Sequence, residues 1–121
     1  MVKSFKDLIV WQKSIELCTL VYQVTKKYPK DELYGIVSQI RRSCVAIPSN
    51  IAEGQTRGHK QEYVQFLRIA FASAAELETQ LLVSGKIDYI SDSDFEKVNN
   101  LLQEILKMLN KLISVLLEPS H

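Results

Sequence analysis

SDSDFEKVNNLLQEILKMLNKLISVLLE, residues 91–118, has the clearest structural pattern in the chain. Apolar residues recur at alternating intervals of three and four, which places them on one face of an α-helix. Ser91 and Ser93 are candidate caps, and Ser93 with Glu96 fits a capping box at the start of this helix. The apolar stripe keeps the heptad spacing of a helix that packs against other helices. Its members are Phe95, Val98, Leu102, Ile105, Leu109, Leu112 and Leu116.

Three further segments with helical spacing precede this one, and short breaks separate them. Pro29 disfavours helical backbone at the residue before it, and Asp31 is the expected cap of the second segment. Gly58 marks the second break, and Gly85 is the expected stop of the third segment. The four helices are expected at about residues 6–28, 32–55, 60–84 and 92–117.

Four helices of similar length joined by short loops predict an all-α fold. The expected architecture is an antiparallel up-down-up-down four-helix bundle in which residues 1–121 form one domain. The length agrees with this, because 121 residues are enough for one domain with a core and too few for two. Hydrophobic residues make up 46% of the chain, which argues against disorder.

Charge and targeting signals favour a soluble cytoplasmic protein with no membrane partner. The net charge of +1 gives no general preference for a polyanion, although lysines are concentrated in residues 1–30. The N-terminus lacks the pattern of a signal peptide, and no apolar run approaches the roughly 18 residues that a membrane span needs. Cys18 and Cys44 lack CxxC spacing and lie on apolar faces, so we expect two buried thiols.

The segment expected over residues 6–28 carries two apolar stripes, one more than a simple surface helix needs. One stripe contains Ile15 and Tyr22, and the other contains Leu17 and Val21. Surplus apolar surface is usually covered by a partner. We therefore expect the chain to form a homo-oligomer through its first, second and fourth helices.

Residues 41–58, RRSCVAIPSNIAEGQTRG, combine helical spacing with a proline and unusual polarity. Pro48 has no amide hydrogen, so the carbonyl of Cys44 is left for an outside donor such as an Arg or Asn side chain. Arg42 and Glu53 lie roughly 16 Å apart on the face away from the core and need other partners. We expect a polar network that sets helix register and assembly. The predicted network comprises Arg42, Asn50, Glu53, Ser73 and Glu76.

QIRRSCVAIPSNIAEG (39–54) and EYVQFLRIAFASAAELETQL (62–81) closely resemble the bacterial four-helix bundle proteins of the ribosomal RNA intervening-sequence type. The opening FKDLIVWQKS and the YP-x-x-E-LYG turn also match. The resemblance implies an all-α bundle that assembles into a ring, typically a homopentamer, and a family whose biochemical role is undefined. Some members are encoded inside insertions in large-subunit ribosomal RNA genes. The motif positions are Arg42, Ile47, Asn50, Ile51, Ala52, Glu53, Gly54, Ser73 and Glu76.

Two positions depart from the pattern of this family. His59 stands where a Ser or Thr helix cap is usual, and Ala72 stands where Gly is common. A neutral imidazole can accept the capping hydrogen bond less well than a hydroxyl, and Ala is still small. Neither departure changes the expected fold.

Two functions remain open at the level of sequence. The first is a non-enzymatic oligomeric scaffold that contacts RNA or DNA, or a nucleic-acid enzyme. A related bundle serves diversity-generating retroelements beside a reverse transcriptase, so the resemblance implies a partner of that kind. The alternative is a protein–protein adaptor that binds no nucleic acid. The expected nucleic-acid contacts are Lys3, Lys6, Lys13, Arg57 and Lys60.

Catalysis is not expected from this sequence. His59 and His121 do not form the paired Glu-x-x-His motifs of a di-iron bundle. No phosphate-binding loop and no nucleophile motif is present. We therefore expect no enzymatic activity, metal, cofactor or small-molecule substrate.

Overall fold

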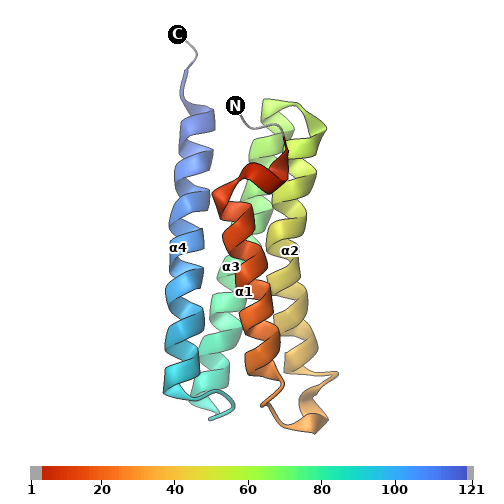
Figure 1. The fold of residues 1–121 in the computed structure, drawn as a ribbon, viewed down its shortest axis with the longest axis vertical. Coiled ribbons are helices and arrows are strands. Elements are labelled where there is room, and N and C mark those ends of the chain that lie inside the picture. Colours follow the sequence, from red (N-terminus) through yellow and green to blue (C-terminus); the bar gives the residue numbers. More distant parts are fainter. Residues whose placement is uncertain (1–3, 120–121) are drawn as a thin grey trace.

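The structure of the protein is a computed structural model that describes residues 4–119. In chain order its elements are η1 (Phe5–Asp7), α1 (Ile9–Thr25), η2 (Lys30–Glu32), α2 (Ile36–Arg57), α3 (Lys60–Lys86) and α4 (Asp92–Leu117). The four α-helices alternate in direction, so that α1 begins and α4 ends at the same end of the molecule (Figure 1). The described residues contain no strand. The predicted all-α, antiparallel four-helix bundle is confirmed.

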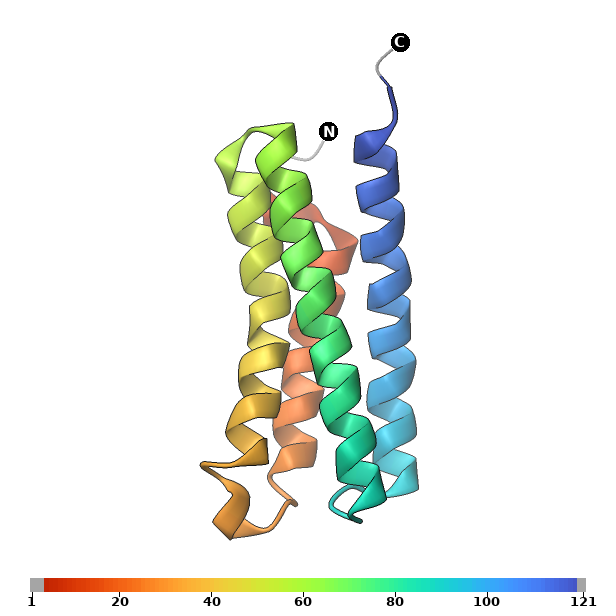
Figure 2. The same ribbon diagram turned by 180° about the vertical axis from the view of Figure 1, so that it is seen from behind.

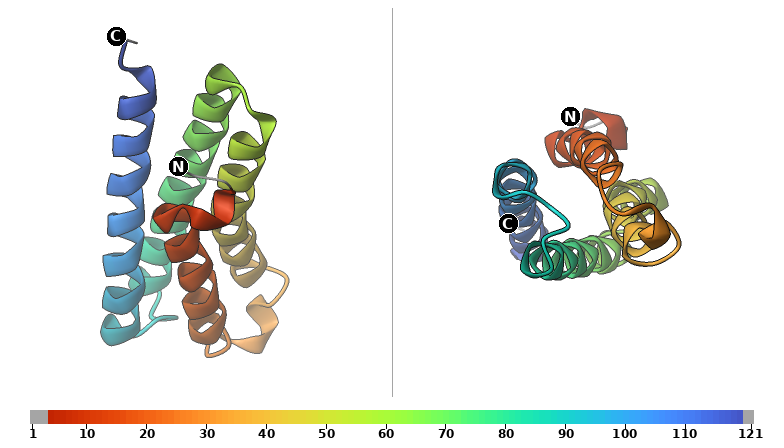
Figure 3. Two further views of the ribbon diagram at one scale, coloured as in Figure 1. Left: turned by 45° about the horizontal axis from the view of Figure 1, so that its top comes forward. Right: turned by 90° about the horizontal axis from the view of Figure 1, so that it is seen from below.

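Each helix packs against its neighbour in the chain, and α4 also packs against α1. Seen from one end, the helices occupy four corners, with α1 diagonal to α3 (Figure 3). From behind, α3 lies between α2 and α4 (Figure 2). The most extensive contact is between α2 and α3. Gly54 permits it, because a Cβ added at Gly54 would lie 2.7 Å from the Cβ of Phe66.

One apolar stripe from each helix forms the core. On α4 the predicted stripe is buried from Val98 to Leu109. Its first member, Phe95, and its last two, Leu112 and Leu116, are only half-buried, and Ile113 is buried in their place near the end of the helix. A straight α-helix has 3.6 residues per turn, so a strict heptad stripe drifts out of the core over several turns. The largest fully buried side chains are Leu17, Ile40, Ile47, Ile51, Leu67, Leu77, Leu81, Leu102, Ile105, Leu109, Val21 and Val98.

The two stripes of α1 have different surroundings. The stripe that contains Leu17 and Val21 is buried in the core. The stripe that contains Ile15 and Tyr22 lies at the surface, where these side chains are 41% and 39% exposed. The chain therefore carries apolar surface on α1 that its own bundle does not cover.

The first helix is shorter than the predicted 6–28. Residues 5–7 form η1, where Ser4 Oγ accepts from the Lys6 amide and the Asp7 carboxylate accepts from the Ser4 amide, each at 3.2 Å. Leu8 is extended, so α1 begins at Ile9. At the other end, the amide of Tyr28 donates to Thr25 at 3.1 Å in a tight turn that ends the helix.

The second helix begins at Ile36, four residues later than predicted, and Asp31 does not cap it. Asp31 lies in η2, and the chain bends at Gly35 before α2 starts without a side-chain cap. The Tyr89 hydroxyl donates to Glu32 Oε2 at 2.7 Å and holds η2 against the loop between α3 and α4.

The ends of the third and fourth helices also differ from the predicted capping. α3 passes through Gly85 and ends at Lys86, and Asp88 takes the left-handed conformation, with φ 62°, that was expected of a glycine. His59 precedes α3 but its side chain makes no capping hydrogen bond. The bounds of α4 match the prediction, and its cap is Ser91, one of the two candidate caps, whose hydroxyl accepts from the Asp94 amide at 3.1 Å. The capping box predicted for Ser93 with Glu96 is therefore wrong.

α2 continues through Pro48, which is buried. The predicted outside donor to the Cys44 carbonyl exists, but it is neither an Arg nor an Asn. The Cys18 thiol of α1 donates to this oxygen at 3.4 Å.

No helix in the described part of the chain is long and apolar enough to span a bilayer.

Candidate functional site

The middle of α2 is joined to α3 by a hydrogen bond between side chains. Ser43 is buried, and its hydroxyl lies 2.5 Å from Glu76 Oε1 and 3.0 Å from the Gln39 carbonyl. The hydroxyl carries one proton, and the shorter contact is to the charged acceptor, so the proton points to Glu76. Glu76 was a predicted network residue, whereas Ser43 was missed because a serine beside a core stripe has no distinctive sequence signal.

The other predicted network residues do not join this pair within one chain. Asn50 donates to the Ala46 carbonyl of its own helix at 2.7 Å. Among the described residues, the exposed Arg42 has no ion pair and the half-buried Ser73 has no side-chain hydrogen bond. The five residues therefore lie at separate points along the α2–α3 pair, and their role in assembly stays a prediction.

The turn between α2 and α3 is built around Arg57. Its guanidinium lies 3.6 Å from Glu53 and 3.5 Å from Glu62, and 5.0 Å above the ring of Phe66. The pair with Glu53 has the i,i+4 spacing of favourable helix pairs, which contribute about 0.2–0.5 kcal/mol. This guanidinium is thus already engaged with carboxylates and an aromatic ring.

The remaining predicted nucleic-acid contacts differ in how freely they could meet a phosphate. Lys13 forms an ion pair with Glu104 of α4 at 2.9 Å, and the hydrogen bond to that carboxylate raises the pKa of the Lys13 amine. Lys6 and Lys60 are exposed, and neither forms an ion pair within residues 4–119. Lys3 lies outside the described residues.

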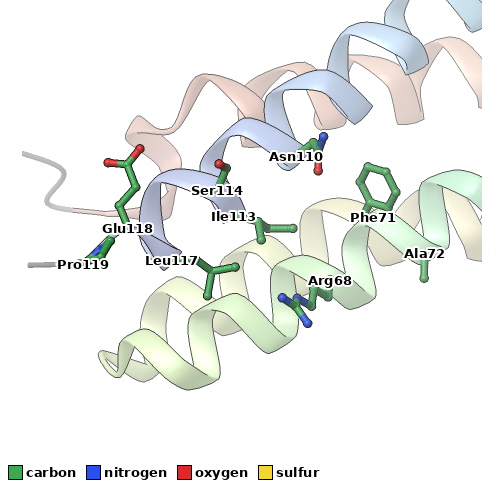
Figure 4. A pocket seen from close by; sticks show the side chains of 9 residues that line it. All are labelled: Arg68, Phe71, Ala72, Asn110, Ile113, Ser114, Leu117, Glu118 and Pro119. Carbon is green, nitrogen blue, oxygen red and sulfur yellow. The ribbon is translucent and has the colours of Figure 1, made fainter.

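A groove between the start of α3 and the end of α4 contains two adjoining hollows of about 640 and 560 Å³. We call it the α3–α4 groove. Figure 4 shows Ile113 and Leu117 of α4 facing Arg68 and Phe71 of α3 across it. Lys60 lines the second hollow, and Arg68 and Leu117 line both. Arg68 was not among the predicted contacts, because a single arginine on a helix gives no sign of facing a groove.

A second groove lies between α1 and α2 at the other end of the molecule. This α1–α2 groove has a volume of about 500 Å³ and is lined by Tyr22, Leu33, Tyr34, Ser38, Arg41, Arg42 and Val45. Tyr34 is 92% exposed and Val45 is 42% exposed. Arg41 lies 4.5 Å above the Tyr22 ring and donates to Thr25 Oγ1 at 3.0 Å, which fixes the wall of the groove.

The outer ridge of α2 continues from this groove along the helix. It consists of Arg42, Val45, Ala46, Ser49 and Glu53, all exposed or half-exposed. The ridge therefore has a positive charge near one end, a negative charge near the other, and short side chains between them.

The residues brought together give no arrangement for metal binding. No group of three or more His, Cys, Asp or Glu side chains in residues 4–119 could hold a metal ion. The grooves hold apolar side chains, hydroxyl groups, amides and cations, and the α3–α4 groove is also lined by the carboxylate of Glu118. Such surfaces can bind other molecules through contact and charge.

The family follows from comparison with known proteins. Residues 6–111 match the 23S rRNA-intervening sequence protein family. The chain belongs to this family. A solved structure from Bacteroides thetaiotaomicron, a protein with unknown function from the S23 ribosomal protein family, is 29% identical with a TM-score of 0.80. The match covers 87% of this chain and 98% of that one. No curated protein matches the chain, and neither description names an enzymatic activity.

Proposed function

We propose that this family member is a non-enzymatic scaffold of the cytoplasm that assembles with copies of itself through α1 and α2. The observation that carries the proposal is the uncovered apolar stripe of α1, which runs beside the α1–α2 groove. Ile15, Tyr22 and Val45 are each about two-fifths exposed there. Burial of such side chains is the main driving force of protein association.

Charge on the outer ridge of α2 argues that the occupant of this face is a second copy. Among the described residues, Arg42 has no ion pair, and Glu53 has an ion pair only with the exposed Arg57, at 3.6 Å. Arg57 also pairs with Glu62. A copy placed with its Glu53 against Arg42 would satisfy both charges. The small side chains of Ala46 and Ser49 between them let two helices approach closely. The family resemblance makes five the expected number of copies.

A charge exchange tests this pairing. Arg42→Glu alone and Glu53→Arg alone should each weaken assembly, because each places like charges at the contact. The double variant Arg42→Glu/Glu53→Arg should restore it. Glu53→Gln should weaken assembly less than Glu53→Arg, because it removes the attraction without adding repulsion. The measurement is solution mass by light scattering, with helicity by circular dichroism as the folding control. Unchanged mass in Arg42→Glu would contradict the pairing.

A specific observation favours nucleic acid as a second partner of the assembly. Lys60 and Arg68 line the α3–α4 groove, and neither has an ion pair within the described residues. Phe71 and Leu117 line the same groove, and the single carboxylate in the described part of its lining is that of Glu118. Cations beside apolar and aromatic side chains are typical of surfaces that bind single-stranded nucleic acid. We place the contact here, and not at Lys13 or Arg57, whose charges are already paired.

Binding to labelled single-stranded RNA and DNA over a series of salt concentrations tests this second function. Affinity should fall steeply with salt, because each phosphate contact releases a counterion. Lys60→Glu/Arg68→Glu should remove the binding, and Lys86→Glu at the far end of α3 should leave it unchanged. No binding at low salt would support a protein–protein adaptor instead, as would binding that neither salt nor the double variant alters.

A further inference from the structure

Cys18 of α1 and Cys44 of α2 form a close pair of thiols inside one chain. The Cys44 thiol donates a hydrogen bond to Cys18 Sγ across a distance of 3.3 Å. The Cys18 thiol donates in turn to the carbonyl oxygen of Cys44 at 3.4 Å. Both cysteines are free. A disulfide has a sulfur–sulfur bond of about 2.05 Å, so the two atoms need to approach by roughly 1.3 Å.

Pro48 explains why Cys18 is held in this position. In a regular helix the amide of residue 48 would donate to the Cys44 carbonyl, but proline has no amide hydrogen. The carbonyl is therefore available to the Cys18 thiol, which brings the two sulfur atoms side by side. Serine or alanine at position 18 or 44 would keep the helices but lose the pair.

The two thiols differ in exposure. Cys44 is fully buried, whereas Cys18 is half-buried on the outer stripe of α1, between the exposed Ile15 and Tyr22. The hydrogen bond received from Cys44 lowers the pKa of the Cys18 thiol. The same bond, together with burial, raises the pKa of Cys44. Because the thiolate is the reactive form, a small oxidant from solvent reacts first at Cys18.

We propose that Cys18 and Cys44 are a redox pair that hydrogen peroxide converts to an intramolecular disulfide between α1 and α2. The Cys18 thiolate attacks one peroxide oxygen, the O–O bond breaks, and Cys18 becomes a sulfenic acid while hydroxide leaves. Cys44 sulfur then attacks Cys18 sulfur, the S–O bond breaks, and water leaves with the Cys44 proton. The two thiols lose two electrons and two protons, and the peroxide is reduced to two waters.

The disulfide would link the middle of α1 to the middle of α2. The linked residues are 26 positions apart, so the bond restricts the unfolded chain and should raise the melting temperature of the oxidised protein. Both cysteines belong to one chain, so the bond needs no second copy. Cys18 lies on the outer stripe of α1 that the proposed assembly would cover, so assembly would slow its oxidation.

The test is intact mass after treatment of the reduced full-length chain with hydrogen peroxide, followed by unfolding in N-ethylmaleimide. The wild-type chain should lose the mass of two hydrogens and take up no maleimide, and a dithiol reductant should reverse both changes. In Cys44→Ser, Cys18 should stop at the sulfenic acid and be trapped by dimedone. In Cys18→Ser, Cys44 should stay reduced and take up one maleimide.

Three results would overturn the inference. The first is uptake of two maleimides by the oxidised wild-type chain, and the second is a disulfide-linked dimer in place of an internal bond. The third is dimedone labelling of Cys44 in Cys18→Ser at the rate seen for Cys18 in Cys44→Ser. Light scattering on the same reduced samples reports assembly separately, so failure of the redox pair is distinguishable from failure of the scaffold.

Discussion

At the scale of single residues, the Ser43 hydroxyl is the side-chain link between the middle of α2 and Glu76 of α3. Ser43→Ala should lower the free energy of unfolding by about 1 kcal/mol, less than the usual value for a hydrogen bond to a charge because Glu76 is exposed and can be resolvated. Ser14→Ala is the matched control, since the equally buried Ser14 hydroxyl bonds only the Trp11 carbonyl of its own helix. It should change stability by less than about 0.5 kcal/mol in urea unfolding. Equal losses in the two variants would contradict the link.

Tyr28 carries a buried hydroxyl that finds no hydrogen-bond partner among the described residues. The nearby Ser84 hydroxyl is committed to the Gln80 carbonyl at 2.8 Å. Burial raises the pKa of the Tyr28 phenol more than the nearness of Ser84 lowers it. The folded chain therefore holds this proton more tightly than the unfolded chain, whose tyrosines titrate near pH ~10. This contribution to stability is complete below that pH and is lost as pH rises through the folded pKa.

Tyr28→Phe should consequently flatten the loss of stability at alkaline pH. At neutral pH it should be neutral or stabilising by up to about 1 kcal/mol, because it removes a buried polar group without a partner. Tyr34→Phe, at a side chain that is 92% exposed, is the control and should change neither value. The measurement is urea unfolding at neutral and alkaline pH. A clear loss of stability in Tyr28→Phe at neutral pH would mean that the hydroxyl has a partner.

Single-residue features were predicted correctly where they follow from the residue and its own helix, and not where they depend on a residue of another helix. The missing amide of Pro48 indicated from sequence that the Cys44 carbonyl needs a donor. The donor itself, Cys18, depends on how α1 is rotated against α2, which spacing within one helix does not determine. The same reason explains why Ser43 and Arg68 were missed.

At the scale of elements, the contact between α2 and α3 depends on the absence of a side chain at Gly54. A Cβ there would meet Phe66 Cβ at 2.7 Å and the Tyr63 carbonyl at 3.2 Å. Gly54→Ala gains helix propensity of about 1 kcal/mol but forces the helices apart, for which overpacking typically costs about 1–3 kcal/mol. We expect a net loss of roughly 1 kcal/mol in urea unfolding.

Gly85→Ala is the matched control for this element. Gly85 is also helical, but a Cβ there would meet nothing within 4 Å. Alanine should therefore stabilise the protein by about 0.5 kcal/mol, through helix propensity alone. A stabilised Gly54→Ala would show that α2 and α3 do not approach as closely as described.

Helical periodicity identified all four helices and most of their buried faces, because core contact repeats with every turn. The ends of the helices were harder to predict, since they depend on contacts with distant residues. Before α2, for example, the Glu32 side chain of η2 accepts a hydrogen bond from Tyr89, a residue 57 positions away. The left-handed residue after α3 is Asp88, whereas the preference of glycine for this conformation had predicted the end of the helix at Gly85.

At the scale of the whole molecule, the bundle buries one stripe of each helix and leaves further apolar surface uncovered. Val45 of α2 and Val83 of α3 illustrate how such side chains differ in setting. They are 42% and 45% exposed, but Val45 lies in the α1–α2 groove beside Tyr22, whereas Val83 lines none of the grooves described above. The surplus stripe was evident in the sequence. The groove beside this stripe could not be predicted, because it depends on how α1 and α2 pack against each other.

Self-assembly through α1 and α2 is the central claim, and solution mass by light scattering tests it most directly. Wild type and Val83→Glu should both have a mass several times the 13.8 kDa of one chain, near five times if the family ring forms. Val45→Glu should fall to the mass of one chain while keeping its helicity, because it places a charge in the buried contact. A wild-type protein with the mass of one chain, or a Val45→Glu variant with the mass of the wild-type assembly, would contradict the claim.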